Sequence, residues 1–355
     1  MVVVKNINKK YGKVSVLNDI SFSVPKGEIF LFMGPSPSGK SVLMKTIMGL
    51  EKPTSGTIYI DGQDMTDIPP YERDIALIFQ DYMLFPHMKV RDNIGFGLRM
   101  RHVSPDKIKS EVKDTMNLTG LEELGDRYPG ALSGGQRQRV ALARSLVVHP
   151  KVLLLDEPLG NLDFKLQGRM ILELRHLHEK LGITFIYVTH SIEQAMSLAD
   201  NIAVLNKGSI EQIGTPHEIY TNPSSVFVAS FVGDLNLLWG EVTSTSGDTS
   251  TLKSPVGTFS GTFKGKGSLK GKVAYAVRPE KVFLEDEAKD LPNKVEATLI
   301  TQIYVGSDMQ YETQLPDGSS FKAIKKGHGI VDLSKKIGEN VLLGWESSNA
   351  LLLNK

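Results

Sequence analysis

Apolar and polar positions alternate along the chain in two different ways, and the change falls near residue 235. In the first part, the segments 29–33, 152–155 and 183–189 are apolar or nearly so. A run without polar alternation is typical of a strand covered on both faces, as in the middle of a parallel sheet. Helical patterns lie between these runs, so we expect an α/β fold built on a parallel sheet.

Further elements follow from the same patterns. From about residue 86 to 150 the pattern is helical, with helix starts at Val90 and at Ser104, the latter followed by proline in the first turn. A helix is also predicted from Phe164 to Leu181, ending at Gly182. Other strands and helices are expected at residues 2–4, 17–24, 57–60, 74–79, 202–205, 208–214, 216–220 and 224–231.

Beyond residue 235 the helical pattern disappears and short alternating strands replace it. They are predicted at residues 273–278, 294–300, 309–313 and 340–345. This spacing favours a small all-β barrel of the OB type. We therefore expect one domain over 1–235, with a helical subdomain at about 86–150, and a β-rich domain over 236–355.

Charge and composition exclude some functions. The 355 residues include 41 basic and 40 acidic side chains, a net charge of +1, which gives no indication of a nucleic-acid partner. There is no cysteine, so disulfides and thiol chemistry are excluded. The first residues do not resemble a secretory signal, and no apolar run approaches the roughly 20 residues that span a bilayer. The sequence predicts a cytoplasmic protein that reaches a membrane only through a partner.

The segment that follows the apolar run 29–33 carries the clearest chemistry. It has the pattern G-x-x-x-x-G-K-S and leads into a predicted helix; its residues are Gly34, Pro35, Ser36, Pro37, Ser38, Gly39, Lys40 and Ser41. Strand, tight loop and helix is the context in which this pattern indicates a phosphate-binding loop, because backbone N–H groups and the helix N-terminus converge on one anion. We expect Lys40 to reach the β- and γ-phosphates and Ser41 to ligate Mg²⁺. The alternative is a glycine-rich turn before a helix.

Two residues at this loop fit a phosphate less well. Pro37 has no N–H and removes one donor from the cradle. Val42 stands where a second hydroxyl would help to bind a phosphate. We expect nucleotide binding to survive both.

Polar side chains follow three predicted strands at the edge where ligands bind in open α/β sheets. Asp156 and Glu157 come directly after 152–155, Gln80 follows 74–79 and His190 follows 183–189. We expect Asp156 to hold Mg²⁺, directly or through water, and Glu157 to act as general base toward the attacking water. Gln80 is placed to touch Mg²⁺ or a water, and His190 to contact the γ-phosphate. The alternatives are an ordinary loop residue for Gln80 and a structural histidine for His190. The remaining histidines form no metal site, since His176 and His178 face different sides of a helix.

A second helix N-terminus carries glycines in its first turn. The segment Leu132, Ser133, Gly134, Gly135 and Gln136 precedes a helical pattern. Ser133 is a good N-cap, and the glycines leave backbone N–H groups uncovered for a phosphate. The alternative is an ordinary capped helix, for which two glycines are a poor choice.

With these motifs in this order, residues 1 to about 235 resemble an ABC-transporter ATP-binding subunit. The segment Val277–Val282 resembles the C-terminal domain of importer ATPases for sugars, polyamines, sulfate or iron. The resemblance implies ATP with Mg²⁺, Tyr11 stacked on adenine, and Asn161–Asp163 crossing a dimer interface. The chain departs from the family at Pro37, Val42 and Gly160. The segment 231–236 is similar to polyamine-importer ATPases.

Two phosphate-seeking helix N-termini but one set of carboxylates indicate a dimer. Ser133 and Gly135 of one copy would close over the γ-phosphate held at Lys40 of another, so that two ATP molecules are sandwiched in a two-fold pair. The twin is a second copy or a paralogous subunit. The resemblance implies transmembrane permease subunits as partners, a solute-binding protein acting indirectly, and a peripheral place on the cytoplasmic face of the membrane.

Three other functions share part of this pattern. A non-transport ABC ATPase of the repair or translation type would have two cassettes or a long coiled coil, and neither is present. A nucleotide kinase shares the phosphate loop but has no use for residues 132–136. A regulatory module that binds nucleotide without hydrolysing it is suggested by Pro37.

Overall fold

The computed structural model describes residues 2–160, 164–263, 271–327 and 336–354. Its contacts divide the chain into two compact units, Met1–His217 and Glu218–Lys355. Each unit has its own apolar core. The predicted α/β fold and the all-β second part are both confirmed.

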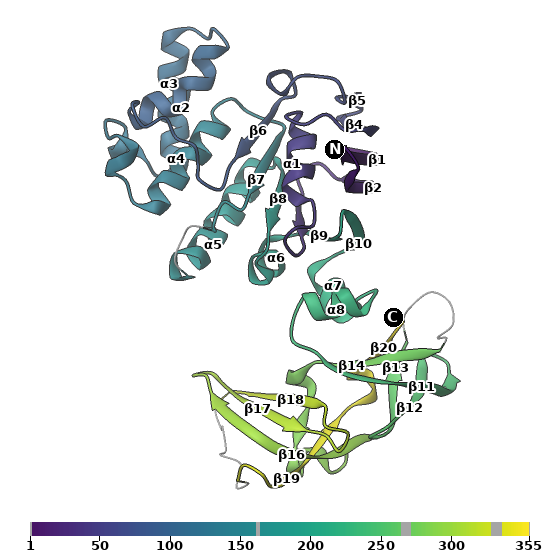
Figure 1. Cartoon of the computed structure of the whole chain (residues 1–355). Coiled ribbons are helices and arrows are strands. Elements are labelled where there is room, and N and C mark those ends of the chain that lie inside the picture. The colour runs from purple at the N-terminus through teal and green to yellow at the C-terminus, as the bar shows by residue number, and fades with distance from the viewer. Residues whose placement is uncertain (1, 161–163, 264–270, 328–335, 355) are drawn as a thin grey trace. The chain divides into compact units, whose positions relative to one another are not determined.

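The first unit contains two sheets (Figure 1). The six-stranded sheet is parallel except at one edge, where β10 pairs antiparallel with β9. Its order is β10 (Ser209–Gly214), β9 (Asn201–Asn206), β3 (Ile29–Met33), β8 (Thr184–Thr189), β7 (Val152–Asp156), β6 (Ile75–Ile78). The antiparallel sheet has the order β2 (Val14–Val24), β1 (Val2–Tyr11), β4 (Ser55–Ile60), β5 (Gln63–Asp64).

Helix α1 (Lys40–Met48) packs in the apolar core that both sheets share. Leu43, Met44 and Ile47 are buried there with Phe22 of β2 and Phe32 of β3. Because strands β3, β7 and β8 are buried along almost their whole length, the apolar runs of the sequence correctly marked the middle of the sheet. Helices α5 (Phe164–Leu181) and α6 (Ile192–Leu198) complete this part, and α5 has the predicted bounds.

The predicted helical subdomain is present as α2 (Val90–Met100), α3 (Pro105–Thr119) and α4 (Gly134–Leu146). The three helices share a separate core that includes Ile94, Val112 and Val140. Figure 1 shows them grouped together beside β6, the edge strand of the six-stranded sheet. Their grouping gives this region an apolar core of its own, distinct from the core between the two sheets.

The second unit begins with short helices and continues as two sheets. The helices are α7 (Pro216–Thr221), which starts at the division between the units, and α8 (Val226–Phe231). A closed barrel has the order β11 (Asn236–Ser246), β12 (Thr249–Ser254), β13 (Gly257–Thr262), β20 (Ala350–Leu353), β14 (Lys272–Val277). A five-stranded sheet has the order β15 (Phe283–Leu284), β19 (Asn340–Trp345), β16 (Asn293–Tyr304), β17 (Asp308–Gln314), β18 (Ser320–Lys326).

The predicted barrel is thus accompanied by a second sheet. Both contribute to one core, in which Trp345 of β19 packs against Phe259 of β13 and Phe321 of β18, and its Nε1 donates to Tyr275 Oη at 2.8 Å. Helix α8 is tied to this unit because the buried guanidinium of Arg278 donates to the carbonyl oxygens of Ala229, in its last turn, and Gly233, just after it. The domain boundary expected at residue 235 lies after α8 and stays a prediction.

Candidate functional site

The loop between β3 and α1 is packed closely against neighbouring strands. At Gly34 a Cβ atom would lie 2.2 Å from the carbonyl oxygen of Leu205, and at Gly39 it would lie 2.9 Å from that of Val16. Gly39 also has a φ of 94°, in the left-handed region. Both glycines are therefore required by the backbone, and the loop is held in place from β9 and β2.

Lys40 begins α1 and directs its ammonium group back into this loop. Its Nζ donates to the carbonyl oxygens of Gly34 at 2.7 Å and Pro35 at 3.1 Å, and to Ser38 Oγ at 3.2 Å. The side chain is 8% exposed. Burial lowers the pKa of Lys40, while the two carboxylates after β7 oppose that shift. A buried ammonium group surrounded by backbone at a helix N-terminus is well placed to bind an anion.

The carboxylates Asp156 and Glu157 lie side by side where β7 ends. The Glu157 N–H donates to the carbonyl oxygen of Val188 in the neighbouring strand at 3.0 Å, and its φ is 46°. Burial, followed by the charge of Glu157, raises the pKa of Asp156, whereas Lys45 and Lys40 oppose the shift. The charged form of Asp156 is thus disfavoured overall in this state, and a cation beside it would relieve that cost.

Gln80 and His190 approach the same carboxylate from the two neighbouring strands. His190 Nδ1 lies 3.1 Å from Glu157 Oε2, with the histidine side chain 67% exposed and the glutamate 22%. A Cβ atom at Gly160 would lie 3.5 Å from Gln80 Nε2 and 3.8 Å from Glu157 Oε2. The fold therefore brings these three side chains to one edge of the sheet.

The donors at this edge suit a hard divalent cation. The expected ligands are the hydroxyl of Ser41 in the first turn of α1, the amide oxygen of Gln80 and the carboxylate of Asp156. Oxygen donors of this kind, few in number, are typical of Mg²⁺ that is shared with a bound phosphate. Within the described residues, no group of three or more His, Cys, Asp or Glu side chains is arranged to hold a metal ion.

The second predicted phosphate site lies at the start of α4. Gln136 N donates to Ser133 Oγ at 3.3 Å, and Ser133 N donates to Gln136 Oε1 at 2.9 Å, so the two residues form a capping box. Gly134 and Gly135 form the first turn between them, and a Cβ atom at Gly135 would make ordinary contact with Leu166. In Figure 1, helices α4 and α1 lie on either side of β6 and β7. The two helices are therefore separate in one copy of the chain.

The family resemblance also predicts roles for Tyr11 and Asp163. Tyr11 ends β1, is 46% exposed, and has Lys9 Nζ 4.9 Å from its ring centroid. An exposed ring at a strand end is accessible for stacking on a base, and this role stays a prediction. Asp163 lies outside the described residues.

Arg144 on α4 makes a contact that the sequence patterns do not predict. Its guanidinium donates to the carbonyl oxygens of Met83 at 2.7 Å and Tyr82 at 2.8 Å, in the turn that follows Gln80. In the sequence it is one arginine among several in a helix, so only the fold distinguishes it.

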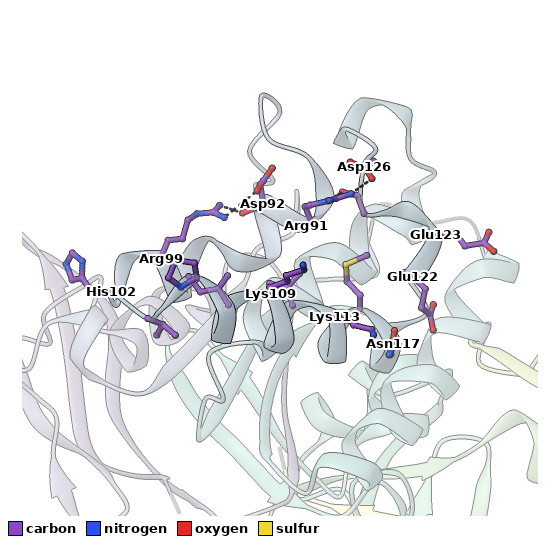
Figure 2. A pocket seen from close by; sticks show the side chains of 16 residues that line it. Arg91, Asp92, Arg99, His102, Lys109, Lys113, Asn117, Glu122, Glu123 and Asp126 are labelled. Carbon is purple, nitrogen blue, oxygen red and sulfur yellow. Dashed lines mark hydrogen bonds and ion pairs between the residues drawn. The ribbon is translucent and has the colours of Figure 1, made fainter.

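Figure 2 shows a hollow between α2 and α3, about 880 Å³ in volume. Arg91 and Arg99 of α2 line it together with Lys109, Val112 and Met116 of α3. The two arginines are also paired with acidic side chains, Arg99 with Asp92 and Arg91 with Asp126. The hollow thus combines charged and apolar groups.

Comparison with known proteins places these features in a family. A model described as ABC transporter matches residues 17–160, and one described as TOBE domain matches residues 275–353. The chain is 41% identical to the spermidine/putrescine import ATP-binding protein PotA of Protochlamydia amoebophila, over 100% of this chain and 96% of that protein. It is 42% identical to the protein of the same name from Trichormus variabilis, over 91% and 86%.

Solved structures are similar to part of the chain. A dimeric ATP-binding cassette in a post-hydrolysis state with ADP and Pi is 31% identical, with a TM-score of 0.54, over 61% of this chain and 99% of that one. The cbiO1 protein of Clostridium perfringens, part of an ABC transporter complex, is 32% identical, with a TM-score of 0.58, over 65% and 92%. Within the described ranges, no helix combines the length and apolar character needed to cross a bilayer.

Proposed function

This chain belongs to the ABC transporter family as an importer ATPase, and we propose that its importer carries a polyamine of the spermidine or putrescine type. The proposal is supported by relatives bearing that name, which are about as long as this chain and are matched over nearly all of it. Sugar, sulfate and iron importers are the alternatives within the same family.

The nucleotide is gripped by the loop after β3. Lys40 leaves the carbonyl oxygens of Gly34 and Pro35 and pairs with the β- and γ-phosphates of ATP, while the N–H groups at the start of α1 bind the same oxygens. Ser41, Gln80 and Asp156 would hold Mg²⁺, which would supply positive charge next to the phosphates. Tyr11 stacks on the adenine.

Hydrolysis uses the carboxylate that lies at the same sheet edge. Glu157 accepts a proton from the attacking water, whose oxygen forms a bond to the γ-phosphorus as the bond to the bridging oxygen breaks and ADP leaves. His190, 3.1 Å from Glu157, donates to the γ-phosphate and orients the carboxylate.

The site is completed by a twin subunit. The first turn of α4, with Ser133, Gly134, Gly135 and Gln136, closes over the γ-phosphate of ATP bound to the other copy. The resemblance to ABC-transporter ATP-binding subunits implies that Asp163 contributes to the same interface. Loss of the γ-phosphate removes this contact, so ATP favours the closed pair and hydrolysis opens it.

The closing and opening of the pair drive the permease subunits. The hollow between α2 and α3 offers charged and apolar groups to a cytoplasmic helix of such a subunit, which would hold this chain at the inner face of the membrane. A solute-binding protein acts indirectly, on the other side of the permease.

The ATP-hydrolysing part of the proposal rests on the shared sheet edge, where Glu157, His190 and Gln80 lie near a buried Lys40. The polyamine part rests on the named relatives. The test is uptake of labelled putrescine and spermidine by cells that lack this chain. The parent restores uptake and Lys40→Ala does not, although both are made in equal amounts. Restored uptake of a labelled sugar, sulfate or iron, with no gain for polyamines, would overturn the substrate and leave the importer ATPase in place.

A further inference from the structure

The turn that follows Gln80 has an unusual backbone. Tyr82 has a φ of 61° and Met83 a φ of 43°, both in the left-handed region that disfavours residues with a side chain. Two such residues in succession persist only where neighbouring groups hold them. The structure shows which groups these are.

Arg144 holds the turn from α4. Its two terminal nitrogens donate separately to the carbonyl oxygens of Met83 and Tyr82, at 2.7 and 2.8 Å, and the guanidinium carbon lies 5.4 Å from the ring centroid of Phe85. A planar guanidinium can donate to two diverging carbonyl oxygens at once, whereas the ammonium group of a lysine lacks this geometry. The backbone of the turn is therefore tied to one helix through one side chain.

The other face of the turn contacts the catalytic edge. The Tyr82 side chain is 4% exposed, and its hydroxyl donates to the carbonyl oxygen of Pro158 at 3.2 Å. Pro158 directly follows Glu157, whose own φ is 46°. A displacement of the turn thus reaches the backbone beside the proposed base within one hydrogen bond.

We propose that Arg144 is a positioning residue for ATP hydrolysis: it holds the Tyr82–Met83 turn against Pro158 and so keeps the Glu157 carboxylate in register with α4. This inference rests on the proposed function, since it takes Glu157 as the base and the start of α4 as the cap on the twin's ATP. One guanidinium then links the helix that closes over one nucleotide to the carboxylate that activates the attacking water at the other nucleotide. Closure of the pair and alignment of the base become a single event.

The experiment compares Arg144→Lys with the parent in steady-state ATP hydrolysis and in nucleotide titration. Lysine keeps the charge but has no fork, so the turn loses one of its two donors. We expect kcat to fall on the order of 10–100-fold, as for a small misplacement of a catalytic group. ATP affinity stays within about twofold, since Arg144 does not touch the phosphate loop.

A matched control lies on the same helix. Arg139 makes a similar fork to Glu173 of α5, with contacts of 2.6 and 3.1 Å, but does not touch the turn. Arg139→Lys is expected to keep the parent kcat. Equal thermal midpoints for the two variants would exclude general loss of stability as the cause of any difference.

Tyr82→Phe provides a second variant that keeps the buried ring and removes only the hydroxyl toward Pro158. It too is expected to lower kcat with little change in ATP affinity, and it decides the question if Arg144→Lys does not fold. Parent-like kcat in Tyr82→Phe, or in a folded Arg144→Lys, overturns the positioning role. If the parent itself shows no hydrolysis that depends on Lys40 and Glu157, it is instead the proposed function that fails.

Discussion

Pro37 and Val42 are the residues of the nucleotide loop that fit a phosphate least well. Pro37 is exposed in the loop and has no N–H to donate. Val42 packs against the apolar core shared by the two sheets, so its side chain contributes to folding instead of offering a hydroxyl. The glycines and Lys40 keep their close contacts. The nucleotide loop therefore keeps the positive charge of Lys40 but lacks one backbone N–H donor.

Restoring that donor is expected to strengthen binding. Pro37→Gly adds one backbone N–H beside the phosphates, and a net hydrogen bond of about 0.5–1.5 kcal/mol corresponds to roughly a 2–10-fold gain in ATP affinity. Calorimetric titration measures it. Pro316→Gly, in an exposed turn of the second unit, controls for the added chain flexibility. Equal ATP affinity in Pro37→Gly and the parent would dismiss the missing donor.

Among single elements, α4 has an N-terminus with a structural role, to which the proposed function adds a second. The Ser133 hydroxyl caps the helix in one copy, and the proposed function asks the same turn to bind the twin's γ-phosphate. A capping box uses the N–H of the third helical residue. The N–H groups of the first turn before it, at Gly134 and Gly135, are the ones that the proposal assigns to the phosphate.

Removal of the cap therefore has two consequences that can be separated. Ser133→Ala is expected to lower the free energy of unfolding by about 1 kcal/mol and to reduce ATP turnover as well. Ser225→Ala removes a similar cap from α8 in the second unit and is expected to cost stability without changing turnover. Urea unfolding and phosphate release measure the two effects. Parent-like turnover in Ser133→Ala would count against its place over the phosphate.

The elements also show what sequence could and could not predict. The buried strands, the bounds of α5 and the residues at the strand ends were predictable, because apolar runs and short motifs are local. Strand β1 was expected only over residues 2–4 but runs to Tyr11, since it gains a partner on each side, β2 and β4. The five-stranded sheet of the second unit and the two hydrogen bonds of the Arg144 guanidinium depend on residues distant in sequence, for which no local pattern exists.

At the scale of the whole molecule, the chain is two units with separate cores. In the second unit, Arg278 is 7% exposed, and its Nη1 donates to the carbonyl oxygens of Ala229 and Gly233 at 2.8 and 2.9 Å. Its guanidinium carbon also lies 4.3 Å from the ring centroid of Tyr220. The arginine anchors α7 and α8 to the β-rich part, which is why these helices belong to this unit.

Substitution of this arginine is expected to affect one unit only. Arg278→Met leaves buried carbonyls without a donor and is expected to destabilise the second unit by about 2–4 kcal/mol. Calorimetry would show one of two unfolding transitions moving down. Arg73→Met is the counterpart, because Arg73 is 2% exposed and donates to the Ile47 carbonyl at the end of α1. If both variants lowered the same transition, the units would not be independent.

In the proposed mechanism, ATP bound at Lys40 of one copy is capped by Ser133 of its twin. Glu157 is the general base for the hydrolysis that ends this ATP-bound dimer. The most direct measurement is the mass of Glu157→Gln in solution with ATP, by light scattering, beside Glu157→Gln with Ser133→Arg. The account predicts a stable dimer holding two ATP molecules in the single variant and a monomer in the double variant. The mechanism would be contradicted if Glu157→Gln stayed a monomer at saturating ATP, or if it hydrolysed ATP at the parent rate. It would also be contradicted if the double variant with Ser133→Arg still formed the dimer.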